Sequence, residues 1–496
     1  MNEHKSSYRQ IVKATSIFGG VQIFQIVITV IRSKFVAILL GPAGMGVMGL
    51  LTATTGLVAG LTNFGLGTSA VKNISEASST DDRDRIVTVI TVIRRLVWFT
   101  GILGAVITLL FSSWLSQFTF GNKEYAVAFV WLSITLLINQ LSTGEMVLLQ
   151  GLRRLQQLAK ANVYGSFVGL LITIPLYFRF GMEGIVPVII ITAFITLFFT
   201  WYFTRSIEIK KEKVSRSTMI LEGKNMLVMG FMISMSGLVA MLVAYFVRIF
   251  INRTGDVADV GYYSAGFAIV NTYVGMVFTA MGTDYYPRLS QVASDNLQCK
   301  EHINQQAEIA LLILAPILIC FLVFLNWAII LLYSRDFLEI TGMIYWATLG
   351  IFFKALSWAI AFVFLAKGAG KLYFWNELAG SIHGLVFSML GYYFAGLTGL
   401  GIAFLASYLL YFIQVYIIAK IKFQFSFYTS LIFIFWIQFL LVLSCFIILN
   451  YVKEPYAYFP SILIVIVSGW YSYKELEKRV GIKDIVQNSI RRIKKK

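Results

Sequence analysis

The sequence predicts an all-α polytopic membrane protein of about fourteen transmembrane helices, arranged as two pseudo-symmetric six-helix lobes plus two C-terminal helices. Composition is the first observation: 58% of the 496 residues are hydrophobic and only 13% are charged, against roughly 25% charged in soluble domains. Apolar runs are the second, since they recur along the chain and reach, with their flanks, the roughly 20 residues that cross a bilayer core. An internal repeat is the third.

Alternating apolar runs and polar turns place the individual elements. We expect helices at 14–40, 44–71, 88–112, 122–149, 160–179, 182–204, 225–252, 259–285, 304–333, 340–366, 373–395, 397–419, 427–450 and 456–473. Pro455 and Pro460 crowd the last turn and leave the number of helices there open. The predicted parts are an N-lobe (1–204), a cytoplasmic linker (205–224), a C-lobe (225–420), helices 13 and 14 (421–473) and a basic cytoplasmic tail (474–496).

The net charge of +17 is spread over the short connections between apolar runs, and does not gather on one domain face. This distribution argues against nucleic acid as a partner and matches the excess of Lys and Arg in cytoplasmic loops of membrane proteins. It predicts a multi-pass membrane protein with both termini in the cytoplasm. The tail carries apolar residues among its basic ones, so it either binds anionic membrane lipids or is simply a solvated positive segment.

A repeat relates the two lobes. At a constant shift of 215 residues, Gly46, Gly60, Gly67, Thr68 and Ser75 align with Gly261, Gly275, Gly282, Thr283 and Ser290, and Gly165 and Gly169 align with Gly380 and Gly384. Six helices per copy give both copies the same orientation, and substrate sites of such transporters lie between the repeats. Glycines 46, 49, 56, 60 and 67 also share one helix face, where small residues allow close helix packing.

Four of the basic residues inside predicted spans are informative, because charge there costs about 2.5–3.5 kcal/mol on insertion scales and usually faces a cavity or partner. Arg32 lies about 13 Å before the end of the first helix at Gly41. Lys34 is turned about 200° from it. Arg248 stands one position past the repeat equivalent of Arg32, and Lys354 lies in the tenth helix. These cations are candidate substrate-binding residues for an anionic, phosphate-bearing substrate, although each could also snorkel or pair internally.

Four of the acidic residues inside predicted spans are informative as well. Glu145 in the fourth helix is the best candidate for a buried acid, and Asp284, Glu308 and Glu377 lie near the inner boundary, where we expect solvation. Glu145 and Asp284 are nevertheless the candidate coupling or gating residues, and the sequence leaves open whether a proton or sodium gradient is coupled.

Enzymatic motifs are not found. The loops are too short for a catalytic domain, and Gly370-Lys371 is followed by Leu372 where a phosphate loop needs Ser or Thr. Three scattered cysteines and three isolated histidines give no metal-ligand spacing. We predict a protein that is not an enzyme and that uses no metal or other cofactor.

Several strings carry a family resemblance: Leu40-Gly41-Pro42-Ala43-Gly44, Phe64-Gly65-Leu66-Gly67, Leu149-Gln150-Gly151, Val260-Gly261-Tyr262-Tyr263-Ser264-Ala265 and Thr283-Asp284-Tyr285-Tyr286-Pro287-Arg288-Leu289-Ser290. In their order and helix placement they resemble bacterial O-antigen translocases of the multidrug/oligosaccharidyl-lipid/polysaccharide exporter superfamily. The spacing of Arg32 and Gly41 is similar to that of an arginine in the related lipid II flippases, which implies a cavity role for Arg32. Val247-Arg248 departs from the acidic residue that related exporters often show there, which weakens any ion-coupling role at that place.

The resemblance implies a flippase of the bacterial inner (cytoplasmic) membrane that moves undecaprenyl-diphosphate-linked oligosaccharide from the cytoplasmic to the periplasmic leaflet by alternating access. It implies a lipid-tail groove formed with helices 13 and 14, and polysaccharide polymerase and chain-length proteins as partners. A multidrug or small-molecule antiporter of the same superfamily is the alternative, with an acidic and aromatic cavity expected. A membrane glycosyltransferase is less well supported, because it would need a loop domain or a carboxylate cluster. The sequence predicts neither the structure of the glycan nor the oligomeric state of the protein.

Overall fold

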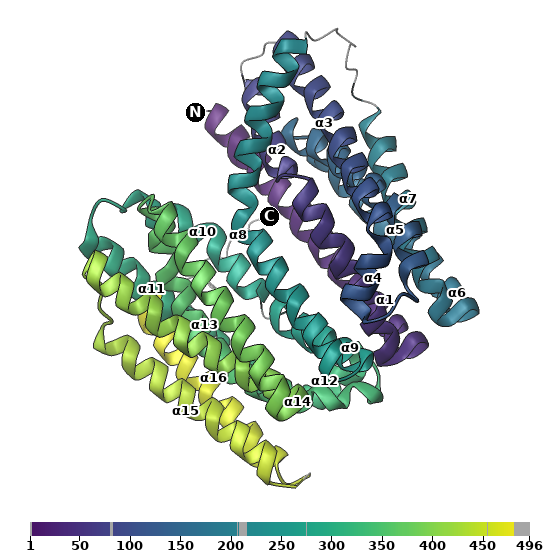
Figure 1. Cartoon of the computed structure of the whole chain (residues 1–496). Coiled ribbons are helices and arrows are strands. Elements are labelled where there is room, and N and C mark those ends of the chain that lie inside the picture. The colour runs from purple at the N-terminus through teal and green to yellow at the C-terminus, as the bar shows by residue number, and fades with distance from the viewer. Residues whose placement is uncertain are drawn as a thin grey trace. The chain divides into compact units, whose positions relative to one another are not determined.

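The computed structural model describes residues 2–79, 83–205, 207, 216–273, 275–453 and 455–480, and every regular element in these ranges is helical (Figure 1). The helices are α1 (Asn2–Thr62), α2 (Leu66–Ser79), α3 (Arg83–Leu110), α4 (Ser112–Phe120), α5 (Ala126–Gly151), α6 (Leu155–Phe180), α7 (Ile185–Thr204), α8 (Arg216–Thr254), α9 (Val257–Ala268), α10 (Gly275–Gln291), α11 (Asn296–Val323), α12 (Leu325–Leu332), α13 (Thr341–Ala366), α14 (Gly370–Phe423), α15 (Thr429–Tyr451) and α16 (Tyr458–Val480). The all-α prediction is confirmed.

The predicted spans can be followed through these elements. Within the described ranges, nine helical stretches are long and apolar enough to cross a membrane. Three of them hold two predicted spans each, namely Phe24–Thr62, Leu155–Thr204 and Gly370–Phe423, and a bent pair, Val257–Thr279 with Asp284–Gln291, supplies another. α16 covers the last predicted span. The predicted boundaries at Gly41 and at Ala395–Gly396 are kinks with non-helical backbone inside α1 and α14.

Two compact units pack separately. The first comprises residues 1–261 and 332–336, and the second comprises residues 262–331 and 337–496. α8 therefore packs with the first six predicted spans, although the repeat assigns it to the second copy. Residues 206 and 208–215 of the predicted linker, and the predicted tail from residue 481 on, lie outside the described residues. The lobe boundaries at 204 and 225 stay a prediction.

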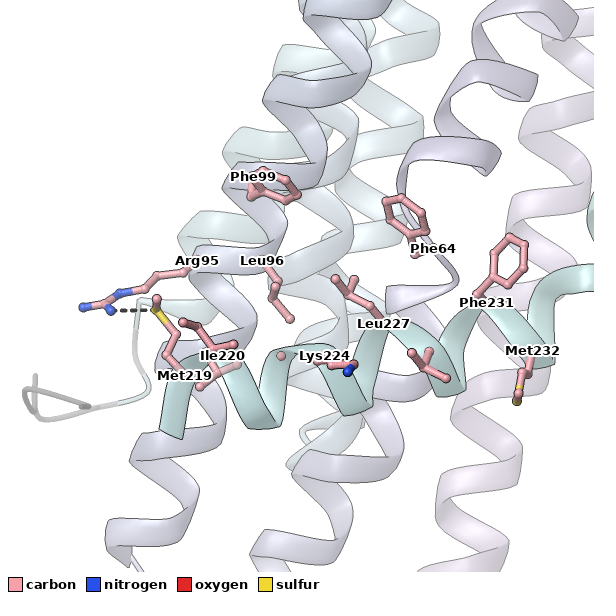
Figure 2. Close-up of a pocket in the computed structure, with 13 residues that line it drawn as sticks. Phe64, Arg95, Leu96, Phe99, Met219, Ile220, Lys224, Leu227, Phe231 and Met232 are labelled. Carbon is pink, nitrogen blue, oxygen red and sulfur yellow. Dashed lines mark hydrogen bonds between the residues drawn. The ribbon is translucent and has the colours of Figure 1, made fainter. Parts of the chain in front are cut away.

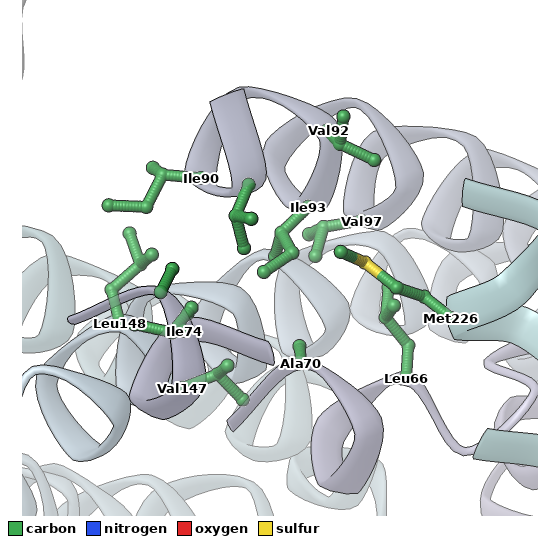
Figure 3. Packing of buried hydrophobic residues seen from close by; sticks show 12 residues of the cluster. Leu66, Ala70, Ile74, Ile90, Val92, Ile93, Val97, Val147, Leu148 and Met226 are labelled. Atoms are coloured by element: carbon green, nitrogen blue, oxygen red, sulfur yellow. The ribbon is translucent and has the colours of Figure 1, made fainter. Parts of the chain in front are cut away.

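The core of the first unit joins α2, α3, α5 and α8. Figure 3 shows the buried cluster in which aliphatic side chains from these four helices meet, including Ala70 of α2, Ile93 of α3, Leu148 of α5 and Met226 of α8. These side chains are 0–1% exposed. Their burial holds α8 against the first copy.

Glycines at the junction of α1 and α8–α9 allow very close packing. A Cβ atom at Gly46 would lie 1.8 Å from the carbonyl oxygen of Val257, and one at Gly261 would lie 1.9 Å from that of Pro42. Gly60 faces Leu238 and Met241 of α8 in the same way, with the nearest atom 3.0 Å from a built Cβ. The predicted packing role of this glycine face is confirmed at these positions.

A break separates α1 from α2, which the sequence prediction treated as one span. Phe64 (φ 49°) and Gly65 (φ 63°) adopt left-handed conformations there, which are costly for a non-glycine residue. A Cβ at Gly65 would lie 2.0 Å from the carbonyl oxygen of Gly230 in α8. The break therefore places α8 directly against the turn and turns the Phe64 side chain toward a groove described below.

In the second unit, polar contacts attach the start of α15 and the end of α16 to α11. Asn304 of α11 is fully buried and donates to the carbonyl of Ser426 (3.1 Å) while accepting from the amide of Tyr428 (2.8 Å). Glu308, one turn on, accepts from Ser430 (2.5 Å) and from Arg479 of α16 (2.7 Å). The expectation that Glu308 is solvated is wrong, because helices distant in sequence cover it.

Candidate functional site

Arg32 lies against α6 of the first unit. Its Nη2 atom is 3.5 Å from the carbonyl oxygen of Ser166, and a Cβ at Gly169 would be 3.2 Å from the same nitrogen. Glycine at 169 thus makes room for the guanidinium. The Nε atom of Arg32 is buried without a hydrogen-bond partner, which is unusual for a buried donor. Arg32 forms no ion pair within 4.0 Å in the described part of the chain.

The other two predicted cations of the first unit differ from Arg32 in their contacts. Lys34 is half-buried on α1. Arg248 of α8 donates from Nη1 to the carbonyl of Ala244, one turn earlier in its own helix, at 3.0 Å. The three side chains belong to the first unit.

Lys354 of α13 occupies an aromatic site in the second unit. Its Nζ lies 5.2 Å from the ring of Tyr408, 5.7 Å from that of Phe404 and 5.8 Å from that of Phe278, within the range of cation–π attraction. The same nitrogen donates to the Oδ1 of Asn271 at 3.2 Å. Asn271 lies in a π-helical turn, Ile269–Tyr273, a distortion that is frequent at functional sites. Sequence reasoning missed Asn271 because no pattern predicts a π-helical turn.

The two predicted coupling acids occupy unlike places. Glu145 of α5 lines a pocket of about 420 Å³ with side chains of α3 and α7. The Asp284 side chain is 83% exposed, and its only ion pair in the described ranges is with Arg288 at 3.9 Å. Asp284 is therefore solvated, as expected from its position near the inner boundary, and its geometry lends no support to a buried coupling role.

A polar network that the sequence prediction missed surrounds Glu377, which was expected to be solvated. The hydroxyl of Tyr411 donates to the Glu377 carboxylate, and Asn376 donates to the Tyr411 oxygen at 3.0 Å. Gln414 donates to the side-chain oxygen of Asn376 at 2.7 Å. A Cβ at Gly380 would lie 2.7 Å from the Tyr411 ring. The two halves of α14 are thus joined by a network that depends on Gly380, the repeat partner of Gly165.

An apolar groove of about 870 Å³ lies between α3, the α1–α2 break and the start of α8. Figure 2 shows Leu96 and Phe99 of α3 and Phe64 of the break beside the α8 segment that carries Leu227 and Phe231. Two exposed cations, Arg95 and Lys224, belong to its lining. Arg95 points toward Met219, whose sulfur lies 2.8 Å from its Nη1 (Figure 2).

A smaller apolar pocket involves the thirteenth predicted helix. It has a volume of about 340 Å³ and lies between α13, α14 and α15, where Phe353, Phe412, Phe427 and Phe435 contribute rings. α15 therefore lines an apolar pocket, whereas α16 contributes none of its lining residues. The predicted lipid-tail groove with helices 13 and 14 stays a prediction.

Solved structures share this fold. An inward-facing multidrug resistance MATE transporter of the MOP superfamily matches with a TM-score of 0.68 and 15% identity, covering 81% of this chain and 94% of that one. The lipid II flippase MurJ in an inward closed conformation matches with a TM-score of 0.68 and 13% identity, covering 94% of this chain and 99% of that one. At such identities, the likeness concerns the fold.

Sequence comparisons are more specific. A candidate O-antigen transporter of Shigella flexneri is 22% identical over 345 residues, which are 68% of this chain and 80% of that protein. The model of the family described as polysaccharide biosynthesis protein matches residues 35–342, more than half of the chain. The chain belongs to the polysaccharide biosynthesis protein family, on the all-helical fold of MOP superfamily transporters.

Proposed function

We propose that this protein is a flippase that moves undecaprenyl-diphosphate-linked oligosaccharide, an O-antigen or other surface polysaccharide repeat unit, from the cytoplasmic to the periplasmic leaflet. The observation that carries this proposal is Arg32: an intramembrane guanidinium with a buried, unpartnered Nε and no carboxylate within 4.0 Å among the described residues. Such a group favours an anionic ligand, because guanidinium forms paired hydrogen bonds with phosphate oxygens.

Lys354 supports the same substrate class. Its ammonium is held by one neutral acceptor, Asn271, and by aromatic rings, so its charge is not neutralised by a carboxylate within 4.0 Å in the described ranges. An ammonium on a flexible stem acts as a point charge for phosphate or for an acidic sugar. Arg32 and Lys354 would each bind the diphosphate during alternating access, with Arg248 and Lys34 as further cations of the pathway.

The prenyl tail requires an apolar surface that remains open to lipid. The groove between α3 and α8 offers one. Its cations Arg95 and Lys224 lie in the first halves of α3 and α8, toward the side from which the headgroup of a substrate made in the cytoplasm would arrive in the predicted orientation. The pocket beside α15 offers a second apolar surface without a cation among its lining residues. We therefore expect substrate loading at the α3–α8 groove.

A multidrug or small-molecule antiporter is the second candidate, because the MATE fold fits as well as that of MurJ by TM-score. Exporters of organic cations need acidic groups in the pathway. Glu377 is occupied by Tyr411, whereas Glu145 lines an aromatic pocket of the first unit and is the acid that this candidate would use. We expect polysaccharide polymerase and chain-length proteins as partners, both termini in the cytoplasm, and no catalytic activity. A proton or sodium gradient could drive the cycle.

Cells that make a surface glycan through this chain provide the test. Deleting the gene should remove the surface glycan and leave lipid-linked oligosaccharide in the cytoplasmic leaflet. Wild-type protein and the Arg179→Ala variant should restore export, because Arg179 lies in an exposed position at the end of α6. Arg32→Ala, expressed to the same level, should not. A normal amount of surface glycan with Arg32→Ala would contradict the role proposed for Arg32. A normal amount of glycan in the deletion strain would contradict the proposed function.

A further inference from the structure

Glu145 lies at one end of a pocket that is otherwise apolar and aromatic. The lining residues come from three helices of the first unit: Trp98 of α3, Leu141 and Glu145 of α5, and Phe194, Leu197, Phe198 and Trp201 of α7. Four of the rings, those of Trp98, Phe194, Phe198 and Trp201, are 49–54% exposed. The pocket is therefore open at the surface of the helices and combines one carboxylate with a wall of aromatic rings.

The pocket runs from the membrane boundary toward the bilayer interior. Glu145 lies six residues before the end of α5 at Gly151, and Trp201 lies three residues before the end of α7 at Thr204. Phe194, ten residues before that end, lies about 15 Å deeper. In the predicted orientation these ends face the cytoplasm, so the carboxylate lies at the level of the inner-leaflet headgroups and the deeper rings at the level of the acyl chains. Tryptophan is enriched at this level of membrane proteins.

The carboxylate retains binding capacity. Its Oε2 atom is buried and accepts no hydrogen bond. The positive charge of Arg94 and the hydroxyl group of Thr204 both act on the Glu145 carboxylate. No basic group of the described chain, however, lies within 4.0 Å of that carboxylate. Arg94 lies one turn before the lining residue Trp98 on the same face of α3, so a positive group stands close to the pocket without pairing directly with Glu145.

The ligand that complements this arrangement has a cation for Glu145, an anion for Arg94 and apolar chains for the rings. A metal ion fits poorly, because the described residues contain no group of three or more His, Cys, Asp or Glu side chains that could hold one. A primary ammonium can donate hydrogen bonds to Oε2 and is also attracted to aromatic faces, whereas a quaternary ammonium has no proton to donate. We infer that this pocket binds an inner-leaflet phosphatidylethanolamine, with its ammonium on Glu145 and its phosphate toward Arg94.

Bound lipid would hold α3, α5 and α7 together. A ligand that binds only the folded protein raises its stability with ligand concentration, so the site should be detectable without any transport substrate. The inference therefore does not depend on the proposed function. It assigns Glu145 to a lipid headgroup, in place of the coupling role that its position in the sequence predicts.

Native mass spectrometry and thermal unfolding of the purified full chain in detergent test the inference. Phosphatidylethanolamine, phosphatidylcholine and phosphatidylglycerol with identical acyl chains are titrated separately. Wild-type protein should retain one phosphatidylethanolamine at concentrations where it retains neither of the other lipids. All three lipids can raise the unfolding temperature equally through their acyl chains, and only phosphatidylethanolamine should raise it further. Equal retention of the three lipids by wild-type protein would overturn the inference without any variant.

The variants locate the site. Glu145→Gln should lower affinity for phosphatidylethanolamine at least tenfold, to the level of phosphatidylcholine, and Trp201→Leu should lower it by several fold. Glu124→Gln is the matched control, because Glu124 is exposed just before the other end of α5 and should bind as wild-type does. Unchanged lipid preference in folded Glu145→Gln would refute the inference. If Glu145→Gln keeps its preference for phosphatidylethanolamine and loses only gradient-driven transport, Glu145 is a coupling residue and the inference is likewise wrong.

Discussion

Gly46 and Gly261 are 215 positions apart in sequence and make the same contact from opposite copies of the repeat. Gly46 packs on the carbonyl of Val257, Gly261 packs on the carbonyl of Pro42, and residues 42 and 257 are themselves related by the shift of 215. Contacts that exchange partners in this way are expected at a pseudo-two-fold axis. The sequence repeat is therefore matched by a structural one at the junction of α1 with α9.

Gly46→Ala should destabilise the protein, because the added methyl group would meet a backbone carbonyl that has no rotamer to relieve the clash. Overpacking in a tight core costs about 1–3 kcal/mol, and we expect a loss of this order or greater in the free energy of unfolding. Gly237→Ala in α8 is the control, since its Cβ would meet no atom within 4 Å. Thermal unfolding in detergent measures both. Equal unfolding temperatures for the two variants would contradict the packing described for Gly46.

Gly380→Ala tests the network around Glu377. The new methyl group would lie 2.7 Å from the Tyr411 ring, so the ring must move and its hydrogen bonds to Glu377 and Asn376 should be lost. We expect a destabilisation of about 1–3 kcal/mol. Gly384→Ala, one turn along α14 with no neighbour within 4 Å, should leave stability unchanged or slightly raise it through helix propensity. The account of this network fails if the two variants unfold alike.

The end of α16 should make stability depend on pH. Hydrogen bonds from Lys478 and Arg479 hold the pKa of Glu475 below its usual value of 4.5. A lowered folded-state pKa stabilises the fold above the unfolded value and loses that contribution as the pH falls through the folded pKa. Wild-type protein should therefore lose stability below about pH 4.5, and Glu475→Gln should lose less over the same interval. Parallel pH profiles of the unfolding temperature would exclude a contribution from Glu475.

Orientation can be tested with single cysteines in a variant that lacks the three native ones. A cysteine replacing Lys123, in the short connection before α5, should react with a membrane-impermeant thiol reagent added to intact spheroplasts. A cysteine replacing Lys72 on α2 should react only after permeabilisation. Both lysines occupy exposed positions, so accessibility in water is not limiting. The reverse pattern would place the termini outside the cytoplasm.

Apolar runs and glycines predict much of this fold, because long spans are specified locally. The kinks at Gly41 and Ala395–Gly396 fall where the sequence predicts helix boundaries. The break at Phe64–Gly65 was not predicted, since the run continues through it and only the close approach of Gly230 requires it. The π-helical turn that presents Asn271 has no sequence pattern of its own.

Burial of charged groups was harder to predict. Glu308 is separated from Arg479 by 171 residues, and Glu377 meets Tyr411 only because α14 folds back at Ala395–Gly396. Position along a span gives the depth of a side chain, whereas these pairings depend on which helices are neighbours. Arg32 was predicted as a pathway residue from depth and resemblance, but its contact with Gly169 of α6 required the structure.

Leaflet exchange in proteoliposomes tests the central claim most directly. Purified wild-type protein is reconstituted with fluorescent undecaprenyl-diphosphate-linked oligosaccharide, and exchange between leaflets is followed by protection from a membrane-impermeant quencher. We predict rapid exchange with wild-type and Arg179→Ala protein, loss of at least tenfold in rate with Arg32→Ala, and partial recovery with Arg32→Lys, which restores charge without the paired hydrogen bonds. Wild-type protein that exchanges no lipid-linked oligosaccharide under these conditions, but exports lipophilic cations against a proton or sodium gradient, would contradict the account.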